Sequence, residues 1–206
     1  MPVHSVYFDG KAVIPSKVVC IGRNYVEHIY ELGNEIPSQM VVFNKPNSAV
    51  SDTLHYFGDS TRFEGEICFL IKSGDIAGVG FGLDLTHADI QNELKRKGLP
   101  WERAKAFDGS AVLSSFVPFR GNIETLSMKL YHDDIRVQHA DYGLMMYKPD
   151  VMIEEIKSFM TLEDGDIIMS GTPKGVGNYK AGDHFIGEVW EDEKLLIRAE
   201  WTATRH

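Results

Sequence analysis

Two glutamates stand one residue apart in an apolar stretch of the chain, FEGEICFLI (63–71). Side chains alternate along a β-strand, so Glu64 and Glu66 would share one face with Cys68 and Leu70, while the other face is wholly apolar. Both faces therefore look buried toward the far end, with two carboxylates at the rim of an apolar interior. Adjacent buried carboxylates repel each other and resist ionisation, and a divalent cation relieves both costs.

A third acid, Asp84, ends the apolar, glycine-rich run GVGFGLD (78–84) just before a predicted helix. Three carboxylates form an all-oxygen set that favours a hard ion such as Mg²⁺, Mn²⁺ or Ca²⁺, whereas zinc usually takes histidine or cysteine. The same residues also fit a simpler interpretation, in which Glu64 and Glu66 lie on a solvated strand face and Asp84 is a turn residue or a helix cap. From spacing alone, the metal site is a hypothesis.

A histidine and a glutamate, His28 and Glu31, lie three residues apart in NYVEHIYELG (24–33), a predicted short helix that Gly33 would end. Residues at this spacing are neighbours on one helical face, and a carboxylate beside an imidazole orients the ring and favours its protonated form. Such a pair suits a general base that takes a proton from water, and nearby glycines would let the segment move as a lid. A surface histidine with an incidental ion pair is the alternative.

Other familiar motifs are missing. The loop SGTPKGVGNYK (170–180) lacks the ending of a P-loop and the third glycine of a dinucleotide-binding fingerprint, although its backbone N–H groups and the Thr172 hydroxyl could still meet an anion. No GxSxG or HExxH occurs, which argues against common serine esterases and zinc proteases. We interpret three histidines as structural or surface residues and two cysteines as small core side chains: His132, His139, His184, Cys20 and Cys68.

The elements that must position these side chains are mostly short strands. A hairpin is predicted over 5–14 around Asp9-Gly10, a dipeptide suited to a type I′ turn. Further strands are predicted over 17–22, 40–44, 63–71, 166–170, 184–190 and 194–201, and a pair of strands over 128–138 around His132-Asp133. Regular alternation of strands and helices is missing, so a doubly wound parallel sheet is not expected.

Three short helices complete the predicted elements. Besides 24–33, a helix over 86–98 begins with Thr86 as its cap and ends at Gly98. A third helix over 150–160 is amphipathic. Its expected buried residues are Val151, Ile153, Ile156, Phe159 and Met160.

Composition limits the class of protein. The chain has 206 residues and a formal net charge of −9, from 21 Lys plus Arg and 30 Asp plus Glu. This balance argues against nucleic-acid and anionic-membrane binding. The N-terminus lacks the features of a signal peptide, and no apolar stretch approaches the ~18 residues of a membrane span. We expect a single cytoplasmic domain over 1–206, with an N-terminal hairpin over about 1–16.

Five motifs stand in a recognisable order: KVVCIGRNYVEHIYELG, FNKPNSAV, FEGEICFLI, GLDLTHADIQNELKRKGLPWERAKAFDGSAVLS and TLEDGDIIMSGTPKGVG. Together they resemble the fumarylacetoacetate hydrolase family across residues 17–200. The chain is most similar to the short, single-domain branch with acylpyruvate hydrolases, fumarylpyruvate hydrolases and oxaloacetate decarboxylases. The resemblance implies an α+β, β-rich fold, a mixed β-sandwich roll, usually dimeric, with Mg²⁺ or Mn²⁺ bound and Ca²⁺ as a substitute.

The resemblance also assigns roles to residues. Glu64, Glu66 and Asp84 match the metal carboxylates of the family, and His28 and Glu31 match its water-activating pair. The positions that line the substrate pocket are matched by Arg23, Gln91, Lys105 and Thr172, with Lys45 of the NKP motif near it. Lys105 or Gln91 would also polarise an oxyanion or donate a proton.

Two departures concern the outer wall of the pocket. Many relatives have a histidine shortly before the first metal glutamate, where Arg62 and Phe63 stand here, and the stretch between Glu66 and Asp84 is shorter. We therefore expect a local loop shape that differs from the family's.

The expected reaction is hydrolysis of the C–C bond of an acylpyruvate-like 2,4-dioxo acid through a metal-stabilised pyruvate enolate. The same enolate serves an oxaloacetate or 2-oxo diacid decarboxylase and an isomerase of aromatic catabolism, which are the alternatives. A remote alternative is a non-catalytic scaffold with structural Ca²⁺, which would leave His28 and Glu31 without a role. We expect a small-molecule 2-oxo or 2,4-dioxo acid as substrate, and a homodimer.

Overall fold

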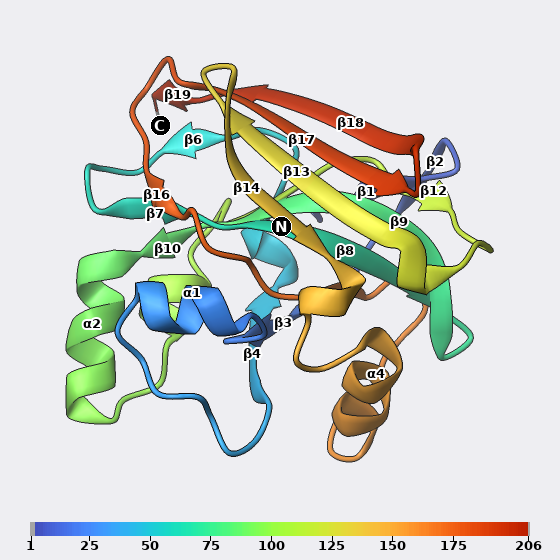
Figure 1. Cartoon of the computed structure of the whole chain (residues 1–206), viewed down its shortest axis with the longest axis horizontal. Coiled ribbons are helices and arrows are strands. Elements are labelled where there is room, and N and C mark those ends of the chain that lie inside the picture. Colours follow the sequence, from blue (N-terminus) through green and yellow to red (C-terminus); the bar gives the residue numbers. More distant parts are fainter. Residues whose placement is uncertain (1–2, 206) are drawn as a thin grey trace.

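A computed structural model describes residues 3–205. Its largest sheet is mixed and curled (Figure 1). In spatial order its strands are β4 (Val41–Pro46), β3 (Lys17–Gly22), β15 (Ile167–Met169), β8 (Gly65–Lys72), β9 (Asp75–Asp84), β11 (Ala111–Leu113) and β5 (Val50–Ser51), with β12 (Val117–Pro118) also paired to β9. β15 pairs with β3, and β11 with β5, in parallel, and the other pairs are antiparallel.

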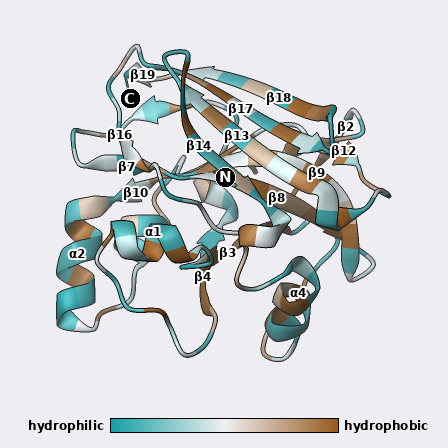
Figure 2. Cartoon of the chain, viewed as in Figure 1, coloured by the Kyte–Doolittle hydropathy of each residue, from teal (hydrophilic) through white to brown (hydrophobic). Residues whose placement is uncertain are grey.

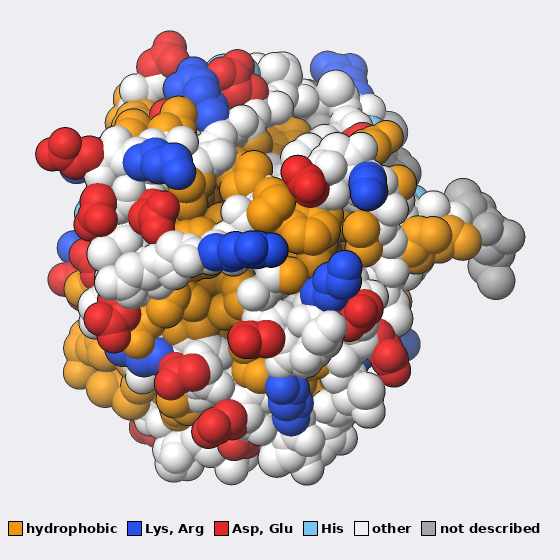
Figure 3. Space-filling model, turned by 90° about the vertical axis from the view of Figure 1, so that its right-hand side faces the viewer, with side chains coloured by type: hydrophobic (Ala, Val, Ile, Leu, Met, Phe, Trp, Pro, Cys, Tyr) orange, Lys and Arg blue, Asp and Glu red, His pale blue; other side chains and the backbone are white. Residues whose placement is uncertain are grey.

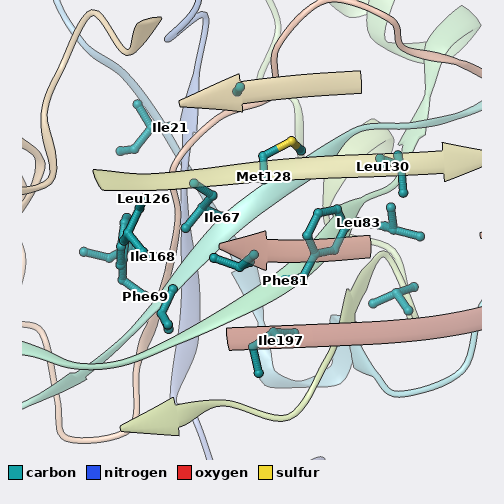
Figure 4. Close-up of a cluster of buried hydrophobic side chains, with 14 of the residues drawn as sticks. Ile21, Ile67, Phe69, Phe81, Leu83, Leu126, Met128, Leu130, Ile168 and Ile197 are labelled. Atoms are coloured by element: carbon teal, nitrogen blue, oxygen red, sulfur yellow. The ribbon is translucent and has the colours of Figure 1, made fainter. Parts of the chain in front are cut away.

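A second, antiparallel sheet packs across β8 and β9. Its strands in order are β14 (Ile135–Asp141), β13 (Leu126–His132), β17 (His184–Glu191) and β18 (Lys194–Thr202). Figure 4 shows side chains of both sheets meeting between them, with Phe81 near the centre. Gly187 lets β17 approach β9 closely, because a Cβ there would lie 2.3 Å from the Phe81 ring. Replacing the fully buried Phe81 with alanine should therefore cost about 3–5 kcal/mol.

Smaller elements surround the two sheets. The short sheets are the hairpin of β1 (Val6–Phe8) and β2 (Lys11–Val13), the set β10 (Thr86–His87), β7 (Thr61–Phe63) and β16 (Gly177–Asn178), and the parallel pair β6 (His55–Tyr56) and β19 (Thr204–Arg205). The helices are α1 (Val26–Glu31), α2 (Ala88–Lys97), α3 (Glu102–Lys105) and α4 (Pro149–Lys157), with 3₁₀ turns η1 (Asn47–Ala49), η2 (Ile123–Thr125) and η3 (Tyr142–Leu144). Figure 1 shows α1, α2 and α4 on the side of the large sheet away from β17 and β18.

β8 is buried on both faces, as the alternation of its residues predicts. Ile67 and Phe69 belong to the core between the two sheets, whereas Cys68 and Leu70 belong to a second core on the other side of the large sheet. Cys20 lies in that second core too, and both cysteines are free thiols. Figure 2 shows hydrophobic residues concentrated on the strands, while α2 is largely hydrophilic. The predicted β-rich fold is confirmed.

Several predicted boundaries differ from the structure. The helix expected over 24–33 is limited to Val26–Glu31, and the strand expected over 63–71 breaks at Glu64 into β7 and β8. Thr86 does not cap α2. It pairs with Arg62 in β10, and its hydroxyl donates to the Glu64 Oε1 carboxylate oxygen at 3.1 Å instead.

Two further elements were predicted with the wrong phase, and one was not predicted. The turn between β13 and β14 lies at Asp133–Asp134, both with φ above +40°, and not at His132-Asp133. Val151 in α4 is exposed, because the buried stripe follows the spacing i, i+3, i+4, i+7 from Pro149, and Phe159, which lies beyond the end of the helix, is exposed as well. The short helix α3 follows the KGLPW segment and had no periodic pattern to announce it.

The right-hand side of Figure 1, where β2 and β12 lie, carries apolar side chains gathered near its centre (Figure 3). Between residues 3 and 205, no helix combines the length and the apolar character that crossing a bilayer requires. The homodimer predicted from the sequence stays a prediction.

Candidate active site

Three carboxylates meet where β8 begins and β9 ends. Gly65 pairs with Leu83 in the antiparallel register, so Glu64 lies directly opposite Asp84, and the Asp84 N–H donates to the Glu64 carbonyl at 2.8 Å. Glu66 projects from the same face two residues further along β8. All three side chains are buried, and one oxygen from each lies within 4.8 Å of the others. The structure thus brings together the acidic set predicted from the sequence.

Three cationic side chains, Lys105, Arg62 and Lys45, offset part of this negative charge. The Lys105 ammonium, at the end of α3, donates to Glu64 Oε2 at 2.8 Å and to Asp84 Oδ2 at 2.7 Å. The Arg62 Nε–H donates to Glu64 Oε1 at 3.0 Å. Burial opposes ionisation of Glu64, but the charges of Lys105 and Arg62 outweigh it and hold the pKa of Glu64 well below its usual range. Burial likewise lowers the pKa of Lys105, and Asp84 and Glu64 outweigh that effect and raise it.

Glu66 has no cationic partner among residues 3–205. It accepts one hydrogen bond, from the Gly171 N–H to Oε2 at 2.7 Å. Burial, followed by the charge of Asp84, raises the pKa of Glu66 well above its usual range. An additional cation close to Glu66 would remove this repulsion.

Asp84 provides a second sign that a cation fits here. Its Oδ1 is buried and accepts no hydrogen bond from residues 3–205, which is rare for a carboxylate oxygen. The Lys45 ammonium lies 2.8 Å from Oδ1 but donates elsewhere. Its acceptors are the carbonyl oxygens of Leu85, Lys105 and Ser110 and the Ser110 hydroxyl. Oδ1 is thus ion-paired with Lys45 but holds no hydrogen bond from the described chain, and such a buried oxygen in an all-oxygen cluster fits Mg²⁺ or Mn²⁺.

The predicted His–Glu pair is formed. Nδ1 of His28 lies 3.0 Å from Glu31 Oε2 on the short helix α1, and the His28 ring is buried. The other Glu31 oxygen accepts the Gly175 N–H at 2.9 Å. Gly175 has φ of +97°, and a Cβ there would lie 1.9 Å from the Val137 carbonyl oxygen, so only glycine fits. The carboxylate that orients the imidazole is therefore itself held by the backbone.

The loop that carries Gly171 and Gly175 offers its N–H groups to anions of the protein itself. The sequence indicated that these groups could meet an anion, and these two donate to the carboxylates of Glu66 and Glu31. The Thr172 hydroxyl donates to the Gly65 carbonyl at 2.9 Å and accepts from the Gln138 amide at 2.8 Å. One loop thus fixes both the acidic cluster and the His–Glu pair.

The side chains line a pocket of about 430 Å³, counting its open mouth. Arg23, His28, Gln91, Lys105 and Thr172 are all in its wall, beside the three carboxylates, as the resemblance implied. Lys45 is not in the wall. It is fully buried, with its ammonium beside Asp84.

Several wall residues were missed or left without a role at the sequence level. They are Leu32, Asn34, Phe43, Lys95 and Trp101, while Arg62 had been noted only as a departure. Arg62 bridges two site residues. Its Nη2 donates to Gln91 Oε1 at 3.2 Å and lies 3.0 Å from Glu64 Oε1, with which it forms an ion pair. The KGLPW segment, one of the family motifs, could have identified Trp101 as a site residue. Nothing in the sequence distinguishes Lys95 from the other two basic residues in the last turn of α2.

Arg23 holds an unusual backbone conformation at the pocket wall. Its φ is +57°, a left-handed value that non-glycine residues rarely adopt. Nη2 donates to Asn34 Oδ1 at 3.3 Å, and Nε is buried without a hydrogen-bond partner in the described part of the chain. The strained backbone and the open donor are typical of a residue that serves a ligand.

A second group of potential metal ligands, His132, Asp133 and Asp183, lies at the surface. His132 Nε2 is 2.8 Å from Asp183 Oδ2, and the His132 ring stacks on Phe185 at 4.5 Å. Asp133 accepts the His184 N–H. These contacts agree with the structural interpretation of His132.

Comparisons with known proteins agree with the geometry. The family model described as fumarylacetoacetate (FAA) hydrolase C-terminal matches residues 17–198. The oxaloacetate tautomerase YcgM of Escherichia coli is 38% identical over 82% of this chain and 85% of its own, and the human mitochondrial oxaloacetate tautomerase FAHD1 is 33% identical over 81% and 83%.

Solved structures give the same result. The crystal structure of a putative fumarylacetoacetate isomerase/hydrolase from Oleispira antarctica superposes with a TM-score of 0.90 at 31% identity, covering 96% of this chain and 98% of its own. Fumarylpyruvate hydrolase from Pseudomonas aeruginosa, in complex with Mn²⁺ and pyruvate, superposes with a TM-score of 0.89 at 25% identity, covering 99% and 97%. Sequence motifs, fold and acidic pocket therefore lead to one conclusion: this chain is a member of the fumarylacetoacetate hydrolase family.

Proposed function

We propose that this protein catalyses the keto–enol interconversion of oxaloacetate, with Mg²⁺ or Mn²⁺ held by Glu64, Glu66 and Asp84. The observation that carries the proposal is the buried acidic cluster, in which Glu66 has no cationic partner among residues 3–205, in the same pocket as His28 and an excess of cationic side chains. The names of the relatives at 38% and 33% identity support oxaloacetate as the substrate.

When bound, the cation would supply Lewis-acid stabilisation of the enolate oxygen, worth several kcal/mol. His28 would be the base. Because Glu31 holds Nδ1, the Nε2 atom is free to remove a proton from carbon 3 of the substrate, and the C–H electron pair becomes the C2=C3 double bond. Such general-base help contributes about 10²–10⁴-fold to the rate.

Lys105 would protonate the carbon-2 oxygen. Two of its three N–H donors are engaged by Glu64 and Asp84, which leaves one for the substrate. In the reverse direction the two roles are exchanged, with Lys105 as base and the His28 imidazolium as acid.

The other wall residues would bind and orient the substrate. Gln91 presents its NH₂ group, because its amide oxygen is engaged by Arg62. Arg23 would neutralise a substrate carboxylate through its open Nε–H donor. Thr172 would shape the pocket floor, and Lys45 would support Asp84 from beneath.

The second candidate is C–C hydrolysis of an acylpyruvate, which the His28–Glu31 contact of 3.0 Å favours. An imidazole held in this way can take a proton from water for attack on the distal carbonyl. The likeness to the fumarylpyruvate hydrolase of Pseudomonas aeruginosa supports this candidate. Decarboxylation of oxaloacetate passes through the same enolate but needs no attacking water.

The deciding experiment is an activity panel with Mg²⁺, with Mn²⁺ and with EDTA. Enol absorbance follows oxaloacetate tautomerisation, loss of the dioxo acid follows hydrolysis of acetylpyruvate and fumarylpyruvate, and pyruvate release follows decarboxylation. We expect metal-dependent tautomerisation to exceed the other activities and to be lost in Glu66→Gln. A wild-type protein that hydrolyses acylpyruvates but leaves the keto–enol ratio of oxaloacetate to relax at its spontaneous rate would refute the first candidate.

A further inference from the structure

The pocket holds more positive charge than the acidic cluster needs. Four cationic side chains line it: Arg23, Arg62, Lys95 and Lys105. Arg62 and Lys105 pair with carboxylates of the cluster. Arg23 and Lys95 form no ion pair with any of the residues 3–205, although the whole chain carries a net charge of −9.

Lys95 lies where a lone ammonium is unfavourable. The side chain is half-buried, and its Nζ lies 5.3 Å from the centre of the Trp101 ring. Burial, followed by the positive charges of Arg23 and Arg62, lowers the pKa of Lys95 to about 8. The charge of Glu64 offsets only part of this, and none of the residues 3–205 forms an ion pair with Lys95, so a negatively charged ligand group beside it would be stabilising.

The position of Lys95 on α2 indicates where that group would lie. Gln91 and Lys95 are four residues apart, so they share one face of the helix, and both reach the pocket. Gln91 is the inner of the two, since it is buried and joined to Glu64 through Arg62. Four residues of α-helix rise about 6 Å, a length comparable to that of a four-carbon diacid. A ligand with one end at the carboxylate cluster would therefore bring its other end toward Lys95.

We propose that Lys95, together with Arg23, forms a subsite for a second substrate carboxylate, so that the enzyme selects 2-oxo acids with a carboxylate on carbon 4 over 2-oxo monoacids. The inference rests on the proposed function, because it assumes that a 2-oxo acid binds at the acidic cluster. Lys95 is then a specificity residue for the far end of the substrate and takes no part in moving the proton at carbon 3.

Three variants test the subsite. Lys95→Met keeps a side chain of similar length against Trp101 and removes the charge, whereas Lys95→Arg keeps the charge. Lys97→Met, an exposed position two residues along the same helix, is the matched control.

The first readout compares oxaloacetate tautomerisation with exchange of the carbon-3 protons of 2-oxobutanoate in D₂O. These two acids share the 2-oxo carboxylate end and differ only at carbon 4. A charge-assisted hydrogen bond is worth roughly 1.5–3 kcal/mol, so Lys95→Met should lower kcat/KM for oxaloacetate by about 10- to 100-fold. The value for 2-oxobutanoate should stay within about twofold of wild type, and Lys95→Arg should recover most of the loss. An equal loss for both substrates, or no loss for oxaloacetate, overturns the subsite.

The second readout is binding without turnover. Malate and lactate share the 2-hydroxy acid end and differ by the carbon-4 carboxylate, and calorimetry on the Mg²⁺-loaded protein gives their dissociation constants. Wild type and Lys97→Met should prefer malate by about tenfold or more, and Lys95→Met should lose that preference. A wild-type protein without a preference for malate overturns the subsite.

The two readouts separate the subsite from the proposed function. If wild type leaves oxaloacetate unchanged yet binds malate through Lys95, the subsite stands and the tautomerase fails. If tautomerisation proceeds and Lys95→Met is unchanged in both readouts, the tautomerase stands and the subsite fails.

Discussion

Replacing Glu66 with glutamine should make the metal-free protein more stable while removing its response to metal. Oxygens of Glu66, Asp84 and Glu64 lie within 4.8 Å of one another, and Glu66 has no cationic partner in the described chain. With an effective dielectric constant of about 20, each such pair of charges repels by roughly 3 kcal/mol. The amide oxygen of glutamine can still accept the Gly171 N–H, so the substitution removes the charge and little else.

We therefore expect metal-free Glu66→Gln to be more stable than wild type by about 2 kcal/mol, because glutamine is neutral in the folded and the unfolded protein and escapes the cost of burying or protonating a carboxylate whose pKa is raised. For a chain of this size that corresponds to a rise in Tm of roughly 4–8 °C. Wild type should gain about 2.7 kcal/mol when Mg²⁺ or Mn²⁺ is added at 100 times its Kd, and the variant should gain almost nothing at the same concentration.

The assay is urea and thermal unfolding of both proteins, in EDTA and in a titration with each metal. Glu93→Gln is the control, because Glu93 pairs with Lys97 on the exposed face of α2, where such a change is worth less than about 1 kcal/mol. A metal-free Glu66→Gln protein less stable than wild type, or one stabilised by metal as much as wild type, would refute the electrostatic reasoning for the site.

The remaining predictions concern the base His28, the loop residue Gly175 and the buried carboxylate of Asp166. His28→Ala should lower kcat by about 10²-fold or more and leave the Kd for Mn²⁺ unchanged, and an unchanged kcat would remove His28 from the mechanism. Gly175→Ala should shift the loop, because its Cβ would lie 1.9 Å from a carbonyl oxygen, and should lower both Tm and kcat; normal values of both would mean that the Glu31 contact is dispensable. Asp166→Asn should cost about 2–3 kcal/mol at pH 7, because Asp166 accepts hydrogen bonds from Ser16, Lys17 and Glu163. Burial opposes ionisation of Asp166, but the hydrogen bonds from Lys17 and Ser16 outweigh burial and lower its pKa. The stability difference between wild type and Asp166→Asn should therefore be complete above about pH 4 and shrink as the pH falls through the folded-state pKa. A stability difference that does not change with pH in urea unfolding would contradict this.

The sequence was informative where a physical pattern is local. Alternation in 63–71 predicted two buried faces of β8 and put Glu64 and Glu66 on one side, and Gly98 ends α2 in the left-handed conformation expected of it. The positions of His28 and Glu31 on one helical turn were equally readable, since three residues fix their spacing. These features depend on neighbours in the chain.

What the sequence could not give depends on neighbours in space. Thr86 fits the pattern of a helix cap, but its hydroxyl serves Glu64 because β10 pairs with β7. Nothing in the loop composition indicated that Gly171 and Gly175 would donate to two different carboxylates. Lys95 is one of three basic residues ending α2, and only its burial beside Trp101 distinguishes it from the exposed Lys97. The resemblance placed Lys45 near the pocket, and packing decides that it lies beneath Asp84.

Lys45 affects how the protein should respond to loss of its metal ion. Its ammonium group is fully buried and hydrogen-bonded to backbone carbonyls and the Ser110 hydroxyl, so it stays beside Asp84 whether or not an ion is bound. Together with Lys105 and Arg62 it reduces the repulsion between the three carboxylates when no metal ion is bound. A chelator should therefore remove activity while the protein stays folded. Adding the metal ion again should restore activity without a refolding step.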